Sequence, residues 1–158
     1  MAARCPVDAG GSYGFREHSK SMSSKAPSAP SSPKFAVDTS ALLAMMQAAP
    51  GGSLVGVKLR HSTLSTVNFY EVLEYSQKHG IDVSSMATDL ALLGMSIEPF
   101  TSDDAYAAAE LINNPAAASL SMSDRACLAL AQRLEVPVLT ADNTWKKLQL
   151  GVEVQVLR

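Results

Sequence analysis

From Lys34 onward, short β-prone runs alternate with longer segments in which apolar residues recur at helical spacing. Such alternation is typical of a parallel sheet, because the connection between two parallel strands carries a helix that covers a face of the sheet. We therefore expect an α/β fold with a parallel sheet covered on both faces. The expected strands comprise residues 34–37, 61–66, 96–100, 136–140 and 152–157.

The segments between these strands have helix start and stop signals. Thr39 is expected to cap the first helix, which stops at Pro50-Gly51-Gly52, and Gly80 is expected to end the helix after the second strand. Thr101 to Asp104 and Ser123-Asp124 are expected to begin the two helices before the fourth strand. The expected helices comprise residues 40–49, 54–59, 67–79, 83–94, 101–114, 125–135 and 144–148.

Residues 1–33 differ from the rest of the chain in composition. They are rich in Ser, Gly, Pro and Ala without apolar periodicity, so we expect a flexible leader followed by one folded domain over residues 34–158. No apolar run approaches the roughly 18 residues of a membrane span, so we expect a soluble protein. Cys5 and Cys127 lie at opposite ends of the chain, which favours a reducing compartment, the cytoplasm, over a disulfide.

Charge divides at the same boundary. The chain has 13 Lys and Arg against 15 Asp and Glu, a near-neutral balance that excludes a polybasic nucleic-acid tail. Residues 1–34 carry five basic and two acidic side chains, whereas residues 35–158 carry eight and thirteen. The folded part is therefore acidic. Such acidity indicates either a solvated surface or carboxylates gathered around a cation, and the positions of the acids decide between them.

Four acids fall where an open parallel sheet binds its ligands, beyond the carboxyl ends of the strands. Asp38 directly follows the first expected strand, and Glu71 lies one turn into the helix after the second. Asp124 is in the first turn of a helix leading to the fourth strand, and Asp142 follows that strand. The strand ends contain no Gly-rich phosphate loop, nucleophile elbow or Ser/His/Asp set, so a carboxylate cluster remains.

The charge of such a cluster must be neutralised, in part by retained protons or by a bound cation. Ionised carboxylates about 5 Å apart repel by roughly 3 kcal/mol per pair at an effective dielectric constant near 20. Hard oxygen ligands suit Mg²⁺ or Mn²⁺. A bound divalent cation lowers the pKa of a water and stabilises charge on a leaving oxygen, which suits phosphodiester hydrolysis.

Three segments together resemble a known family. FAVDTSALLAMM, STVNFYEVLEY and SLSMSDRACLALAQRLEVPVLTADNTW are similar to the corresponding motifs of PIN-domain ribonucleases, specifically the small VapC-like toxins of VapBC-type toxin–antitoxin pairs. The resemblance covers residues 34–158 and rests on the ordered set, since each motif alone is weak. Two departures are a longer leader and Ser-Met-Ser before Asp124, where a small residue such as Gly is common.

This resemblance implies a three-layer α/β/α sandwich and an endoribonuclease that depends on Mg²⁺ or Mn²⁺. It also implies a cognate antitoxin protein that blocks the site, and a homodimer. By the same resemblance the metal ligands and catalytic carboxylates are Asp38, Glu71, Asp124 and Asp142.

Each neighbouring residue also has a structural interpretation. The helix dipole favours an acid at Asp124, and Asp142 with Asn143 is typical of a turn, whereas Asp38 after an apolar strand favours function. Residues expected to support the acids or contact substrate are Thr39, Ser40, Asn68, Thr140 and Arg125. Capping and turn roles explain Thr39 and Asn68 almost as well.

Two rival functions are a catalytically silent PIN-like scaffold, which binds RNA or protein, and a phosphoacceptor receiver domain. A silent scaffold would lack a carboxylate, and none of the four is missing here. A receiver needs an Asp after its third strand, where this chain has Pro99-Phe100. An endoribonuclease therefore remains the favoured function.

Overall fold

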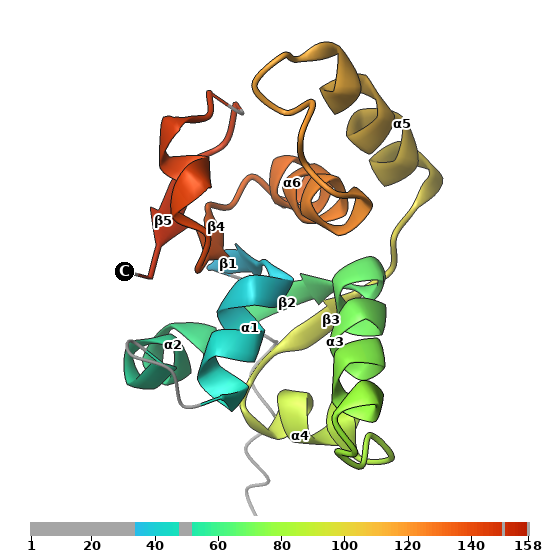
Figure 1. Ribbon diagram of the computed structural model, residues 1–158, viewed down its shortest axis with the longest axis vertical. Helices are drawn as coiled ribbons and strands as arrows, with labels where there is room; N and C mark the ends of the chain where they lie inside the picture. Colours follow the sequence, from blue (N-terminus) through green and yellow to red (C-terminus); the bar gives the residue numbers. More distant parts are fainter. Residues whose placement is uncertain (1–33, 48–51, 150, 158) are drawn as a thin grey trace, which may run out of the picture.

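The computed structural model describes residues 34–47, 52–149 and 151–157, apart from the side chains of 52–55. Within these residues, five strands form one sheet in the order β3-β2-β1-β4-β5 (Figure 1). All neighbouring strands are parallel, which confirms the expected parallel sheet. The strands are β1 (Phe35–Val37), β2 (Ser62–Ser65), β3 (Ser96–Glu98), β4 (Val138–Thr140) and β5 (Val154–Val156).

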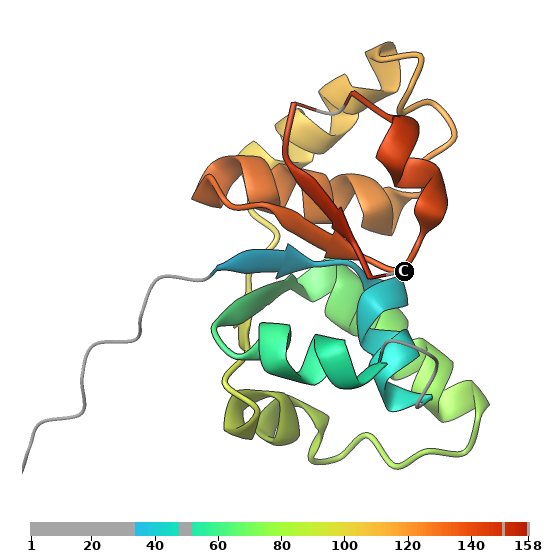
Figure 2. The ribbon, with the colours of Figure 1, turned by 90° about the vertical axis from the view of Figure 1, so that its left-hand side faces the viewer.

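Helices cover both faces of this sheet. α5 and α6 lie on one face and α1 to α4 on the other, so the molecule has three layers, as the resemblance implies (Figures 1 and 2). α3 contacts both α1 and α6. The α-helices are α1 (Thr39–Met46), α2 (Gly52–Leu59), α3 (Thr66–Lys78), α4 (Met86–Leu92), α5 (Ser102–Glu110) and α6 (Met122–Leu134), and the 3-10 helices are η1 (Leu111–Asn113) and η2 (Asn143–Lys147).

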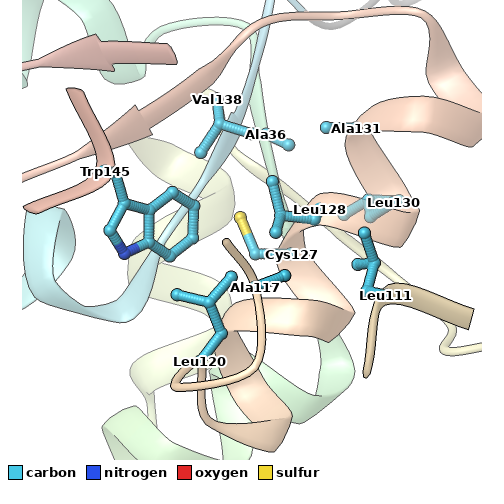
Figure 3. Close-up of a cluster of buried hydrophobic side chains, with 10 residues drawn as sticks. All are labelled: Ala36, Leu111, Ala117, Leu120, Cys127, Leu128, Leu130, Ala131, Val138 and Trp145. Carbon is cyan, nitrogen blue, oxygen red and sulfur yellow. The ribbon is translucent and has the colours of Figure 1, made fainter. Parts of the chain in front are cut away.

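Alternation along the central strands produces two separate cores. Ala36 and Val138 pack with α6 on one face, where Trp145 of η2 lies across from Cys127 (Figure 3). Val37 and Leu139 point to the opposite face and pack against the helices there. Because β1 and β4 are covered on both sides, apolar residues follow one another in each, as in Phe35–Val37 and Val138-Leu139, rather than alternating with polar ones.

Several elements begin or end where side-chain hydrogen bonds dictate. α4 is shorter than the expected helix over 83–94, because Asp82 accepts hydrogen bonds from the backbone and hydroxyl of Ser84 and forms a turn there. β3 ends at Glu98 rather than residue 100, since Pro99 has no amide hydrogen and the Phe100 amide donates to Thr66 Oγ1.

Other boundaries also differ from the expected ones. α5 ends at Glu110 and continues as the 3-10 helix η1, and the expected helix over 144–148 is the 3-10 helix η2. The last strand covers three residues rather than six. The expected leader over 1–33, Cys5 and the helix stop at Pro50-Gly51 lie outside the described residues. Cys127 is a buried free thiol, and in the described part of the chain no helix is long and apolar enough to cross a membrane.

The strand order places a topological switch point at the centre of the sheet. The chain runs from β1 outward through β2 to β3, then returns to the other side of β1 to form β4. Connections on the two sides of β1 therefore diverge, and open parallel sheets bind their ligands beyond the carboxyl ends of the strands at such a point. Asp38 follows β1 and Asp142 lies two residues after β4, so both are at this end of the sheet.

Candidate active site

Asp38 is the N-cap residue of α1 and is 3% exposed. Its backbone is extended, so the alternation of β1 continues and directs its side chain to the α6 face. Oδ2 accepts hydrogen bonds from the amide and hydroxyl of Ser40 and from Thr140 Oγ1, the last at 2.9 Å. Oδ1 accepts none from the described residues. One carboxylate oxygen is held, and the other remains open to a ligand.

Ser40 and Thr140 connect Asp38 to the loop after β4. The Ala141 amide donates to Ser40 Oγ at 3.0 Å, and the Asp142 amide donates to Thr140 Oγ1 at 3.1 Å. A hydroxyl has one proton to donate and lone pairs to accept, so each one can bond Asp38 and the loop at once. The Asp-Thr-Ser motif after β1 and the Thr-Ala-Asp motif after β4 therefore form one hydrogen-bonded unit.

Asp142 caps the short helix η2. Its Oδ1 accepts a hydrogen bond from the Thr144 amide at 2.8 Å, which is the turn interaction that the Asp-Asn pair predicts. Oδ2 accepts no hydrogen bond from the described part of the chain. Turn formation occupies one oxygen, and the other remains open to a ligand.

Asp124 lies in the first turn of α6, whose N-cap residue is Ser121 rather than Ser123. The Asp124 amide donates to Ser121 Oγ at 3.1 Å, and the Ser121 amide donates to Asp124 Oδ2 at 2.8 Å. This reciprocal pair is a capping box. Its Ser-x-x-Asp spacing is visible in the sequence and could have located the true helix start.

Asp38 and Asp124 interact electrostatically. Burial raises the pKa of Asp38, the hydrogen bonds from Ser40 and Thr140 oppose this effect, and the charge of Asp124 raises the pKa further. Burial also raises the pKa of the Cys127 thiol, with contributions from both Asp38 and Asp124. The end of β1 and the start of α6 thus carry two carboxylates within electrostatic reach of each other, and neither forms a salt bridge with a described residue.

The described residues contain no cluster of three metal-ligating side chains. Glu71 is half-buried on α3 and, within the described residues, no three His, Cys, Asp or Glu side chains come close enough together to hold a metal. The grouping of all four carboxylates around one cation therefore stays a prediction. Glu74, one turn beyond Glu71, forms an exposed i, i+4 ion pair with Lys78, at 2.9 Å.

Asn68 connects three helices near the acidic pair. Its side chain is fully buried in the first turn of α3, and Nδ2 donates to Thr39 Oγ1 and to the Ser123 carbonyl, each at 3.1 Å. The sequence indicated Asn68 and Thr39 as supporting residues, but nothing in it indicated the Ser123 carbonyl, because a backbone acceptor has no residue-type signal.

An apolar groove of about 360 Å³ lies between α5 and α6. Arg125, next to Asp124 on α6, contributes a cationic side chain to it. Met122 on the same helix and Ile112 of η1 are strongly exposed for apolar residues. The groove is lined by Phe100, Ala105, Ala108, Ala109, Ile112, Met122 and Arg125.

A solved structure and a protein family resemble this chain. A solved structure described as a toxin-antitoxin complex from Klebsiella pneumoniae matches with a TM-score of 0.60 and 18% sequence identity, covering 77% of this chain and 96% of that chain. At this identity the likeness shows a shared fold. A search of curated proteins finds no match. The model of the PIN-domain family matches residues 35–150, which include all four acids and most of the chain. The chain therefore belongs to the PIN-domain family.

Proposed function

We propose that this protein is a metal-dependent endoribonuclease that hydrolyses RNA phosphodiester bonds, and that it is the toxin of a VapBC-type toxin–antitoxin pair. The observation that carries the proposal is the buried carboxylate of Asp38, which lies near Asp124 at the switch point of the sheet without a salt bridge to a described residue. Membership of the PIN-domain family supports the same function.

The donor set fits a hard divalent cation. The charge of Asp124 acts on Asp38, neither carboxylate has a salt-bridge partner among the described residues, and the neighbouring groups offer oxygen ligands that suit Mg²⁺ or Mn²⁺. The proposed metal ligands and catalytic carboxylates are Asp38, Glu71, Asp124 and Asp142. The bound cation would activate a water and stabilise charge on the phosphate.

The surrounding side chains prepare the carboxylates for this role. Ser40 and Thr140 donate to Asp38 Oδ2 and so favour its ionised form, against the effect of burial. Both hydroxyls also fix the loop that carries Asp142. Arg125 would contact a phosphate of the RNA and offset the acidic field that otherwise repels a polyanion.

The proposed partner is a cognate antitoxin that blocks the site. The apolar groove between α5 and α6 suits the apolar face of a partner helix, and Arg125 in it lies next to Asp124. An Arg of the antitoxin would reach the carboxylates and form charge-assisted hydrogen bonds. A homodimer and a cytoplasmic location complete the proposal.

A catalytically silent scaffold is the second candidate. The observation that favours it is that, among the described residues, no three His, Cys, Asp or Glu side chains come close enough together to hold a metal. Such a scaffold would bind RNA or protein and leave phosphodiester bonds intact.

Cleavage of total RNA distinguishes the two candidates. Purified protein, freed of any partner, is incubated with RNA and Mg²⁺, Mn²⁺ or EDTA, alongside Asp38→Asn. The matched control is Asp82→Asn, because Asp82 is exposed and Asn also supports its turn. We expect metal-dependent cuts at discrete sites with the wild type and the control, and none with Asp38→Asn. Bound but uncut RNA would establish the scaffold instead.

A further inference from the structure

Asn68 joins the two segments that carry the acidic pair. Thr39, which accepts from Nδ2, directly follows Asp38, and Ser123, whose carbonyl also accepts from Nδ2, directly precedes Asp124. One amide nitrogen has two protons, and each goes to one of these segments. We propose that Asn68 is a positioning residue that sets the separation of the Asp38 and Asp124 carboxylates, an inference that rests on the proposed function.

The orientation of the Asn68 amide is determined by its partners. The Ser123 carbonyl can only accept a hydrogen bond, so the amide nitrogen rather than the oxygen must face it. Oδ1 is consequently buried with no hydrogen-bond partner among the described residues. A buried polar group without a partner calls for an explanation beyond packing. The two hydrogen bonds from Nδ2 provide that explanation, because the amide orientation that forms them leaves Oδ1 without a partner.

The acidic pair needs such a connection. Asp38 and Asp124 repel each other when both are ionised, and they belong to helices of opposite layers, α1 and α6 (Figure 1). α3 is in contact with both helices, and Asn68 is the α3 residue that hydrogen-bonds the first turn of each. Loss of its amide would leave the repulsion in place and remove these two hydrogen bonds.

The test measures Mn²⁺ binding by calorimetry, together with the thermal midpoint. Removal of a group that orients metal ligands typically weakens metal binding about 10- to 100-fold, which we expect for Asn68→Ala. Ser76→Ala is the matched control, because Ser76 is also fully buried on α3 and its Oγ also has no partner among the described residues. We expect this control to bind Mn²⁺ with wild-type affinity.

The Thr39 contact separates positioning from folding. Thr39→Val removes the acceptor but keeps the shape, so we expect weaker Mn²⁺ binding, and Thr39→Ser should restore it because the hydroxyl returns. If Asn68 acts through Thr39, the double variant Asn68→Ala/Thr39→Val binds less weakly than the sum of the two single effects predicts. The comparison of Thr39→Val with Thr39→Ser also tests the proposal if Asn68→Ala does not fold.

The outcomes separate this proposal from the nuclease itself. A lower thermal midpoint for Asn68→Ala with unchanged Mn²⁺ affinity would show a merely structural role and overturn the proposal. Absence of Asp38-dependent Mn²⁺ binding in the wild type would also overturn it. If Mn²⁺ binding depends on Asp38 and Asn68 but RNA is not cleaved, the positioning role holds and only the nuclease function fails.

Discussion

Two buried aspartates at helix starts differ in whether they have a cationic partner. Asp38 at α1 is 3% exposed and Asp104 at α5 is 2% exposed. Arg133 Nε donates to Asp104 Oδ1 at 2.8 Å, and the amide and hydroxyl of Thr101 donate to Oδ2. Asp38 has hydroxyl and amide donors on one oxygen but no salt bridge with a described residue.

Their pKa values reflect this difference. Burial opposes ionisation of Asp104, but hydrogen bonds from Arg133 and Thr101 outweigh it and lower its pKa. Burial prevails at Asp38, and the charge of Asp124 adds to it, so the pKa is raised. A carboxylate with its own Arg holds the α5–α6 junction together, whereas one without such a partner is suited to bind a cation from solution.

The largest expected effect is on catalysis at Asp38. Asp38→Asn keeps the shape and the hydrogen-bond acceptor but removes the negative charge, so RNA cleavage should fall by at least roughly 100-fold. Initial rates with a defined RNA at saturating Mg²⁺ measure the loss. Asp104→Asn, assayed at a temperature where it is folded, is the control, and an equal loss of rate in both variants would contradict the contrast.

The next effect is on stability at the α5–α6 junction. Arg133→Met leaves Asp104 buried without its cation, and we expect a loss of about 2 kcal/mol in the free energy of unfolding, discounted for the partial exposure of Arg133. Urea unfolding measures this loss. The folded variant should cleave RNA at the wild-type rate, and unchanged stability would show that the pair contributes nothing.

A smaller change in the free energy of unfolding, of opposite sign, is expected at Asp38. Asp38→Asn relieves the burial of a charge and its repulsion from Asp124, so it should stabilise the fold at neutral pH by roughly 0.5–2 kcal/mol. Urea unfolding of Asp38→Asn beside Asp104→Asn compares the two positions directly. Destabilisation by both substitutions would mean that Asp38, like Asp104, stabilises the fold.

The smallest effect is a change of stability with pH. The pKa of Asp38 is raised in the folded state. Its contribution to the free energy of unfolding is therefore fully present below the unfolded pKa of 3.8 and is lost as pH rises through the folded pKa. The lowered pKa of Asp104 acts in the opposite sense, because its contribution is present above 3.8 and is lost as pH falls through the folded value.

Unfolding from about pH 3 to about pH 7 checks both signs. The advantage of Asp38→Asn over the wild type should grow as pH rises. The disadvantage of Asp104→Asn should shrink as pH falls. A constant difference across this range in either variant would contradict the assigned direction.

The sequence predicted the parallel sheet and the strand that leads to Asp38, because both depend on local patterns of apolar residues. It placed several helix ends wrongly, since those ends depend on single side chains such as Asp82 and Ser121. Local spacing indicates charge pairing only where the partners are close in sequence, as in Glu74 and Lys78. The Arg133–Asp104 pair spans 29 residues and arises from packing of α5 on α6, which no local pattern encodes.

In the candidate site too, local sequence patterns indicated individual residues but not their long-range contacts. Strand-end position indicated Asp38 and Thr140, and their contact across 102 residues follows from the pairing of β1 with β4. The link from Asn68 to Ser123 spans 55 residues and depends on how α3 meets α6. Whether Glu71 and Asp142 approach Asp38 is likewise a matter of side-chain placement rather than of sequence pattern.

The most direct test of the central claim is an NMR titration of the Asp38 carboxyl carbon with and without Mg²⁺. Without the cation, we expect the pKa of Asp38 to lie above that of an ordinary aspartate, and saturating Mg²⁺ should lower it, because the bound charge replaces the missing partner. Asp104 should keep its lowered pKa in both conditions. An Asp38 pKa that Mg²⁺ does not change would contradict the claim that this carboxylate binds the catalytic metal.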